Sequence, residues 1–309
     1  MRLKVGAWWL WVTFLPLGVV LVVTLDRLIN SLGVMKSSER VLIKKVVVVP
    51  TPSQDKYSRG VLGVITGSHK YPGAAVLTTK AAQRTGVGMI RFCSRVKQVN
   101  YLVLEKNPET VTQKVKVQAW LLGSGITTNG DNLLTRRKLK KALKEGLPQV
   151  LDAGAMYLAG KQISPTIITP HYQELSRLFE SRSIKASVVE ISKDPEKWAR
   201  KAAQEFGVTV LLKGNTSVIA DGKKAVVIKS LTTFLATAGT GDVLAGILGA
   251  LVATNYLKLQ NKTISLIDIA HCACLIHQYA ALEASSGGPI SASMIIEKIP
   301  LIIGKAISR

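Results

Sequence analysis

A run of small residues, Ala236-Thr237-Ala238-Gly239-Thr240-Gly241-Asp242, leads directly into an apolar segment that we expect to be helical. Glycines let a backbone approach a ligand closely, and the free N–H groups in the first turn of a helix attract anions. The run therefore predicts a site for a phosphate in transfer. Phosphoryl oxygens repel a carboxylate, so we interpret Asp242 as a base that takes a proton from a hydroxyl group while that hydroxyl is phosphorylated. The alternative is a helix cap without a chemical role.

Two further groups of polar residues follow predicted strands. Lys213-Gly214-Asn215-Thr216-Ser217 offers a cation, a flexible glycine and hydroxyl groups to a nucleotide, although a lysine and glycine at a strand end more often form a solvated turn. His171 follows Thr169-Pro170 and, taken alone, is more often a packed or capping residue. The glycine-bounded loop 67–75 opens a helix of small residues, which suits a flat ligand or close helix packing equally. Neither a P-loop nor a dinucleotide-binding fingerprint occurs.

Cysteines and histidines give no indication of a metal site built from side chains. The chain has three cysteines, and no C-x-x-C pair or Cys/His cluster with metal-ligand spacing occurs. Cys272 and Cys274 are two residues apart in a predicted helix, so they do not face the same way. We expect them to be structural, and His271 and His277 likewise. The sequence therefore predicts no metal site and no disulfide framework, which fits a reducing compartment.

The charge of the chain is strongly positive. Its 309 residues include 41 Lys+Arg and 19 Asp+Glu, a net charge of +22, and 47% are hydrophobic. This composition excludes disordered and fibrous proteins and predicts anionic partners. The basic residues are scattered, with one dense run, Arg136-Arg137-Lys138-Leu139-Lys140-Lys141, that contains no stacking aromatic residue. We therefore expect phosphate-bearing small molecules and no nucleic acid as partners; a catalytically silent, basic binding protein is the alternative.

The amino terminus is apolar. Residues 5–25 carry no charge and are long enough to cross a bilayer as a helix. A cleavable signal peptide would have a shorter apolar core and a small-x-small cleavage site, so we interpret the run as an uncleaved anchor. Basic residues follow it closely, which favours keeping the remaining chain in the cytoplasm. The alternative is that translation starts at Met35 and that residues 1–34 are not part of the working protein. A cytoplasmic location is expected in either case, with membrane contact only if residues 5–25 are a real anchor.

Beyond residue 45, short β-branched runs alternate with longer amphipathic segments. This is the pattern of one α/β domain over 45–309, with a mostly parallel central sheet and helices on both faces. Strands are predicted at 61–66, 89–93, 119–122, 149–151, 166–168 and 208–213, followed by a hairpin over 216–228. Helices are predicted over 73–85, near 133–145, from 172, over 197–206, from 241, from 264 and near 293.

The candidate residues share one place in this order of elements. In such sheets, ligands bind at the carboxyl ends of the strands, where loops and helix amino termini gather. The sequence places the turn Gly123-Ser124-Gly125, Asp152, His171, Lys213 and the loop before Asp242 at these ends. We therefore expect one site rather than several.

In this order, the motifs resemble the ADP/ATP-dependent NAD(P)H-hydrate dehydratases, of the ribokinase-like fold, and especially their actinobacterial members. The resemblance extends over roughly residues 50–303. It is carried by Gly67-Ser68-x-x-Tyr71-Pro72-Gly73-Ala74-Ala75, Gly86-Val87-Gly88, Gly123-x-Gly125, Leu151-Asp152-Ala153, Thr169-Pro170-His171-x-x-Glu174, Leu211-Leu212-Lys213-Gly214 and the loop 235–246.

The resemblance implies a hydro-lyase that restores NADH or NADPH from their hydrated forms, NADHX and NADPHX. ADP or ATP would phosphorylate the ring hydroxyl, and phosphate would then be eliminated. Asp242 would be the catalytic base. The nucleotide would be held by Lys213, Gly214, Asn215, Thr216, Ser217, Gly239, Thr240 and Gly241. The substrate pocket would be lined by Ala74, Ala75, Gly123, Gly125, His171 and Asp242.

The resemblance also implies magnesium with the nucleotide phosphates and a homo-oligomer, which we expect to be a tetramer. Relatives often carry a fused epimerase domain, and the residues before the matched region are too few for a domain of roughly 50–250 residues, so we expect a separate epimerase. The alternative on the same fold is a small-molecule kinase that phosphorylates a vitamin-precursor alcohol and stops there.

The sequence departs from the family pattern at a few positions. Gly154 stands where a second acidic residue is usual, and Ser124 and Ile126-Thr127 interrupt a glycine-rich turn. Tyr172-Gln173 replaces small residues, and Met294 stands where an Asp is common. Asp242, Lys213 and His171 are all present, so we expect an active enzyme.

Overall fold

The computed structural model describes residues 3–5, 8–10, 35–127, 133–160 and 164–308, which fall into two compact units, Met1–Lys36 and Ser37–Arg309. In the first unit, β1 (Leu3–Val5) pairs antiparallel with β2 (Trp8–Leu10). Most of the apolar run 5–25 lies outside the described residues. Within the described part of the chain, no helix combines the length and apolar character needed to cross a bilayer.

The second unit is built around one eight-stranded sheet. The strand order is β10-β9-β8-β7-β6-β5-β3-β4, and the six strands from β8 to β4 are parallel, whereas β9 and β10 are antiparallel. The mostly parallel sheet predicted from the sequence is therefore confirmed. The strands are β3 (Val61–Ile65), β4 (Met89–Phe92), β5 (Ala119–Leu122), β6 (Gln149–Leu151), β7 (Thr166–Ile168), β8 (Thr209–Leu212), β9 (Thr216–Ala220) and β10 (Ala225–Lys229).

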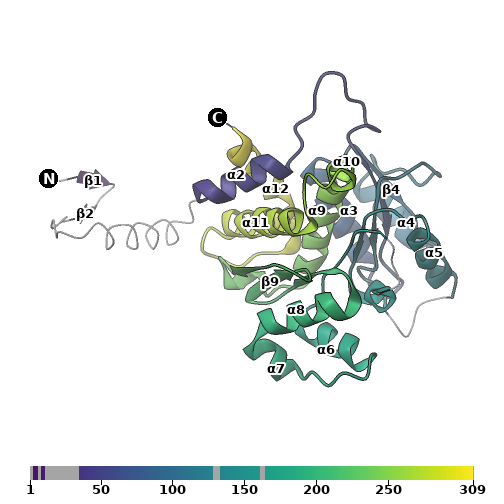
Figure 1. Ribbon diagram of the computed structural model, residues 1–309. Helices are drawn as coiled ribbons and strands as arrows, with labels where there is room; N and C mark the ends of the chain where they lie inside the picture. The colour runs from purple at the N-terminus through teal and green to yellow at the C-terminus, as the bar shows by residue number, and fades with distance from the viewer. Residues whose placement is uncertain (1–2, 6–7, 11–34, 128–132, 161–163, 309) are drawn as a thin grey trace. The chain divides into compact units, whose positions relative to one another are not determined.

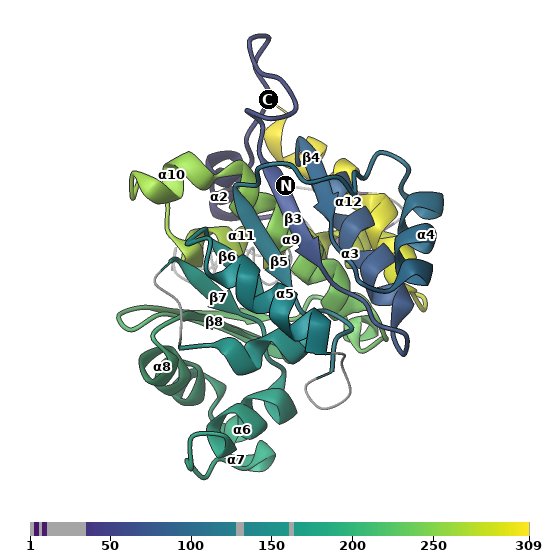
Figure 2. The same ribbon diagram turned by 90° about the vertical axis from the view of Figure 1, so that its right-hand side faces the viewer.

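Helices cover both faces of the sheet, as predicted (Figures 1 and 2). On one face α9 packs against β3, β5 and β6, and α3, α11 and α12 pack around α9. On the other face α8 packs against β8 and β9, and α5 lies over the middle of the sheet (Figure 2). The helices are α2 (Ser37–Val46), α3 (Pro72–Thr85), α4 (Lys97–Lys106), α5 (Leu133–Leu143), α6 (Tyr172–Glu180), α7 (Val188–Lys193), α8 (Pro195–Phe206), α9 (Thr240–Thr254), α10 (Tyr256–Gln260), α11 (Leu266–Ser285) and α12 (Ala292–Ile307), with short 3-10 helices η1 (Ala153–Leu158) and η2 (Thr233–Leu235).

The sequence analysis did not predict four of these helices, α2, α4, α7 and α10, each of ten residues or fewer. It also began the domain at residue 45, whereas α2 starts at Ser37 and packs on α11 and α12. The hydroxyl of Tyr279 on α11 donates to Glu39 Oε2 on α2 over 2.6 Å. The amide of Asn255 holds the end of α2 by donating to the carbonyl of Val46 over 2.9 Å. These contacts join α2 to the helical layer that covers α9.

Candidate active site

Four polar side chains form a hydrogen-bonded row across the carboxyl ends of neighbouring parallel strands. Ser124 follows β5, Asp152 follows β6, Thr169 follows β7 and Lys213 follows β8. Oδ1 of Asp152 accepts hydrogen bonds from Thr169 Oγ1 over 2.6 Å and from Lys213 Nζ over 2.9 Å. Oδ2 accepts from Ser124 Oγ over 2.8 Å. The parallel register thus joins residues that are far apart in the sequence into one polar network.

Charge compensation sets the state of the Asp152–Lys213 pair. Burial by itself would raise the pKa of Asp152, but the charge of Lys213 and the hydroxyl donors hold the pKa of this carboxyl below its usual value. Burial likewise opposes the charged form of Lys213, yet the negative charges of Asp152, Glu174 and Asp242 raise the pKa of its ammonium group. The site therefore contains a fixed, partly exposed cation on a buried carboxylate.

The amino terminus of α9 lies beside this cation. Gly239 caps the helix with a φ of +87°, a left-handed conformation that favours glycine. The hydroxyl of Thr240 fixes the preceding turn by donating to the carbonyls of Leu235 and Thr237, each over 2.9 Å. A Cβ added to Gly241 would lie 3.5 Å from Lys213 Nζ. The absence of a side chain at 241 thus leaves the first turn of a long helix open toward the lysine.

Asp242 stands in that first turn of α9. Burial, together with the charges of Asp152 and Glu174 and against the opposing charge of Lys213, raises the pKa of Asp242 to about 7. A carboxyl group with a pKa near neutrality can both accept and hold a proton under ordinary conditions, which is the property of a general base.

A cavity of about 520 Å³ opens between the ends of β7 and β8, the loop before α9 and helix α11. Seven of the residues proposed from the sequence line it, namely His171, Lys213, Gly214, Asn215, Ser217, Thr240 and Gly241. Thr216, Gly239 and Asp242 are neighbours of lining residues rather than lining residues themselves. This volume is in the range of cavities that hold small ligands.

His171 is the N-cap of α6 and its side chain is half exposed. Its Nδ1 accepts from the backbone N–H of Glu174 over 3.4 Å, and its own backbone N–H donates to Glu174 Oε2 over 2.8 Å. The backbone N–H of Lys213 donates to the carbonyl of Pro170 over 2.7 Å. His171 is thus a capping residue, as one interpretation of the sequence held, and it also lies beside the lysine at the cavity wall.

The sequence analysis missed the α11 side of this cavity. Cys274, His277 and Gln278 line it, although the first two were expected to be purely structural. Burial lowers the pKa of His277 to about 4, so its imidazole is neutral, and its Nε2 has no hydrogen-bond partner among the described residues. The sequence signal was the spacing of Cys274, His277 and Gln278, which places the three on one side of the helix, but this helix is buried along most of its length and the spacing does not stand out.

Ala74 and Ala75 lie in the first turn of α3, and Gly123 and Gly125 follow β5; close packing surrounds both glycines. A Cβ on Gly125 would lie 2.5 Å from the Cβ of Ala74. Gly123 has a φ of +107°, and a Cβ there would lie 2.0 Å from the carbonyl oxygen of Asp152. These four residues do not line the 520 Å³ cavity, so their contact with a substrate stays a prediction.

The described residues hold no group of three or more His, Cys, Asp or Glu that could bind a metal ion. All three cysteines are free and buried, and burial raises the pKa of Cys272 and Cys274. The charged groups described above are the cation Lys213, the hydrogen-bonded carboxylate of Asp152 and the carboxyl of Asp242, whose pKa is about 7.

Comparison with known proteins identifies the family to which this chain belongs. A family model described as NAD(P)H-hydrate dehydratase matches residues 62–301. The chain belongs to this family. It is 35% identical over 286 residues to the bifunctional NAD(P)H-hydrate repair enzyme of Corynebacterium glutamicum. The aligned region covers 83% of this chain and 49% of that protein. It thus spans about half the length of that bifunctional relative.

Two further NAD(P)H-hydrate dehydratases are similar over most of their own length. The ADP-dependent (S)-NAD(P)H-hydrate dehydratase of Nitrosopumilus maritimus is 28% identical over 251 residues, which cover 73% of this chain and 84% of that protein. The crystal structure of the ADP/ATP-dependent enzyme from Bacillus subtilis, crystallised with ATP and Mg²⁺, has a TM-score of 0.74 at 22% identity and covers 86% of this chain and 97% of that one. A ribokinase-like superfamily protein from Enterococcus faecalis has a TM-score of 0.71 at 20% identity and covers 86% of this chain and 94% of that one. The two structural likenesses confirm the ribokinase-like fold.

Two departures from the pattern of NAD(P)H-hydrate dehydratases contact each other. The backbone N–H of Gly154 donates to the carbonyl of Ile126 over 2.9 Å, and a Cβ at 154 would lie 2.3 Å from that oxygen. An acidic side chain at 154 is therefore incompatible with this turn. Ser124, a further altered residue in the same turn, is buried and donates to Asp152. The unusual turn and the glycine thus form one local unit that supports the Asp152 network.

Proposed function

We propose that this protein restores NADH and NADPH from NADHX and NADPHX in a reaction driven by ADP or ATP. The observation that supports this most directly is the placement of Asp242, with its pKa near 7, in the same helix turn that opens toward Lys213. Membership of the NAD(P)H-hydrate dehydratase family supports the substrate class.

The nucleotide is expected to bind in the 520 Å³ cavity, with its phosphates directed toward α9. Lys213 supplies a positive charge at the helix terminus, and the backbone N–H groups around Gly241 add donors where charge develops on the transferring phosphoryl group. Asp152 holds Lys213 in place through the 2.9 Å contact. The hydrated nicotinamide is expected on the other side of Asp242, toward the group formed by Ala74 and Gly125.

The reaction then needs one base and one good leaving group. The ring hydroxyl oxygen attacks the terminal phosphorus, Asp242 takes the hydroxyl proton, and the bond from phosphorus to the departing AMP or ADP breaks. Hydroxide is a poor leaving group and phosphate is a good one. The lone pair of the ring nitrogen expels phosphate from the carbon that carried the hydroxyl group. The next ring carbon then loses a proton to solvent, which restores the dihydronicotinamide.

Several finer points belong to the same proposal. No cluster of three metal-ligating side chains occurs among the described residues, and we propose that magnesium binds mainly through the nucleotide phosphates. We also propose a cytoplasmic location, consistent with the three free cysteines, and a homo-oligomer, with a tetramer as the first arrangement to test.

A direct assay tests the activity. NADHX is incubated with the protein, Mg²⁺ and either ADP or ATP, and reduced nicotinamide absorbance and phosphate release are followed together. We expect the two products to appear in equal amounts, and we expect Asp242→Asn to abolish both. Accumulation of phosphorylated NADHX without any reduced nicotinamide would show a kinase that stops after phosphoryl transfer, and no turnover with either nucleotide would contradict the proposal.

A further inference from the structure

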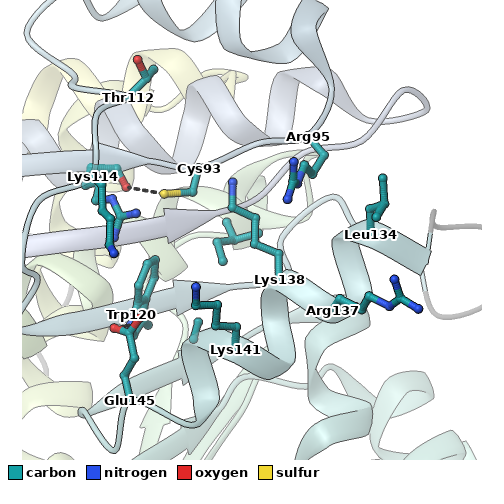
Figure 3. A pocket seen from close by; sticks show the side chains of 13 residues that line it. Cys93, Arg95, Thr112, Lys114, Trp120, Leu134, Arg137, Lys138, Lys141 and Glu145 are labelled. Carbon is teal, nitrogen blue, oxygen red and sulfur yellow. Dashed lines mark hydrogen bonds between the residues drawn. The ribbon is translucent and has the colours of Figure 1, made fainter.

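A second cavity, of about 500 Å³, shares no lining residue with the first. Its walls come from the end of β4, from β5, from the segment after α4 and from helix α5 (Figure 3). It lies on the face of the sheet that α5 covers, whereas α9 lies on the opposite face. Nothing in the proposed reaction uses this cavity.

Two lining residues, Arg91 and Trp120, belong to a row of residues in register across three strands. Gly63 on β3 pairs in register with Arg91 on β4 and with Trp120 on β5. A Cβ on Gly63 would lie 2.4 Å from the Trp120 ring, so the glycine gives the ring space to lie over β3. The guanidinium carbon of Arg91 lies 5.6 Å from the centre of this ring, and the indole N–H donates to Glu145 Oε2 over 2.9 Å.

The charges that line the cavity are strongly unbalanced. Six of its lining residues are cations, namely Arg91, Arg95, Lys114, Arg137, Lys138 and Lys141. The one acidic lining residue is Glu145, and it already accepts the hydrogen bond from Trp120. None of the six cations forms an ion pair with another described residue.

Two observations show that this gathering of cations is costly for the protein alone. Burial, together with the charges of Arg95 and Arg91, lowers the pKa of Lys138. Nε of Arg91 is buried and has no hydrogen-bond partner among the described residues. Like charges held together and a buried donor without a partner are both relieved when an anion binds.

The orientation of the side chains supports a ligand inside the cavity. In Figure 3 the ammonium groups of Lys138 and Lys141 rise from α5 toward the strands, whereas the guanidinium of Arg137 points away. Lys114 reaches toward Trp120 from the opposite wall. Cations from separate segments therefore point into one cavity. On a flat basic surface the side chains would instead extend into solvent.

We propose that this cavity binds a small anion that carries several phosphoryl groups, at a site separate from Asp242 and Lys213. Its volume fits a ligand of nucleotide size. Trp120 is only 3% exposed, so it offers no stacking surface to the bases of a nucleic acid strand. The shared chemistry is a polyphosphate chain, carried either by a nucleoside or by an inorganic polyphosphate.

Calorimetric titration of the full chain with inorganic tripolyphosphate, and separately with ATP, tests this site. The variant Lys138→Gln/Lys141→Gln removes two converging cations. The matched control, Lys140→Gln/Lys144→Gln, removes the same charge from the same stretch of chain, and neither of its lysines lines the cavity. We expect the first variant to weaken tripolyphosphate binding by about tenfold or more, and the control by about twofold or less.

Three further measurements make the outcome decisive. Arg95→Gln, an exposed side chain on a different segment, is expected to weaken binding in the same direction, so the result does not depend on α5 folding normally. The KM for the catalytic nucleotide is expected to stay unchanged in Lys138→Gln/Lys141→Gln, which separates this site from the catalytic one. ATP binding at the catalytic cavity should persist in Lys138→Gln/Lys141→Gln, so only the ATP binding that this variant weakens reports the second site. If that binding is tighter than binding of tripolyphosphate, the ligand carries a nucleoside, and equal binding would identify the polyphosphate chain alone.

Two results would overturn the proposal. An equal loss of tripolyphosphate binding in both double variants would show only general attraction by the positive surface. Binding of poly(U) that is tighter than binding of tripolyphosphate, and that both double variants weaken, would show an extended nucleic acid surface in place of a small-anion site.

Discussion

The ammonium group of Lys213 lies 2.9 Å from the buried carboxylate of Asp152, across the ends of β8 and β6. Removal of one partner from such a pair leaves an uncompensated buried charge. We therefore expect Lys213→Met to lower the free energy of unfolding by about 3 kcal/mol, measured by urea denaturation at pH 7.

The control for this loss is an exposed ion pair. Lys305 and Glu283 are 2.8 Å apart on the surface, and Lys305→Met is expected to cost less than about 1 kcal/mol. The double variant Lys213→Met/Asp152→Asn should recover part of the stability, because it removes the stranded charge. A Lys213→Met protein as stable as the wild type would show that the carboxylate is compensated by its hydroxyl donors alone.

Asp242 should give the reaction an acidic limb near pH 7, because its pKa is raised to about 7 and a base must be deprotonated to act. We expect kcat/KM to rise with pH through this value. The charge of Glu174 contributes to the raised pKa, so Glu174→Gln should move the limb to lower pH while preserving the capping box. Glu180→Gln, an exposed change on the same helix, should leave the limb in place.

The same raised pKa predicts how stability depends on pH. In the unfolded chain Asp242 loses its proton near its model value of 3.8, whereas in the folded protein it keeps the proton to about 7. The wild type therefore loses stability as pH rises between these values, by no more than about 4 kcal/mol. We expect Asp242→Asn to be more stable than the wild type at pH 8 and equally stable at pH 3.5, measured by thermal denaturation. A constant difference at both pH values would mean that the carboxyl is not perturbed.

His277 is expected to contact the nucleotide, because its unpartnered Nε2 belongs to a residue that lines the 520 Å³ cavity. We expect His277→Leu to raise the KM for ADP or ATP by about tenfold, equivalent to one lost hydrogen bond, with a smaller change in kcat. His271→Leu lies on the same helix and does not line the cavity, so its KM should stay within about twofold of the wild type. Equal effects of both substitutions would point to helix packing.

Gly154 should not tolerate a side chain, because a Cβ there would lie 2.3 Å from the Ile126 carbonyl oxygen. We expect Gly154→Ala to destabilise the fold by about 1–3 kcal/mol. Gly304 in α12 has open space around it, so Gly304→Ala should instead stabilise the protein by up to about 1 kcal/mol. Thermal melts of the two variants side by side check this contrast.

Local sequence patterns were sufficient for most of the sheet. The strands Ala119–Leu122, Gln149–Leu151 and Thr166–Ile168 begin and end where the sequence predicted. Each is a short apolar run bounded by turn residues, and both faces of a parallel strand are buried, so the pattern is unambiguous. The helices α7 and α10 were missed because five or six residues contain too few turns to show a periodicity. The longer α4 starts after Val96, which provides no side-chain cap that would mark its beginning in the sequence.

The sequence by itself determined the family, the order of elements and the identity of Asp242, Lys213 and His171 as chemical candidates, because these depend on residues that are close together along the chain. Only the tertiary structure joined Lys213 to Asp152, which is 61 residues away, since parallel pairing decides which strand ends are neighbours. The tertiary structure also decided that part of the basic run on α5 lines a cavity, because Lys138 and Lys141 come close to Arg91 only when the helix packs on the sheet.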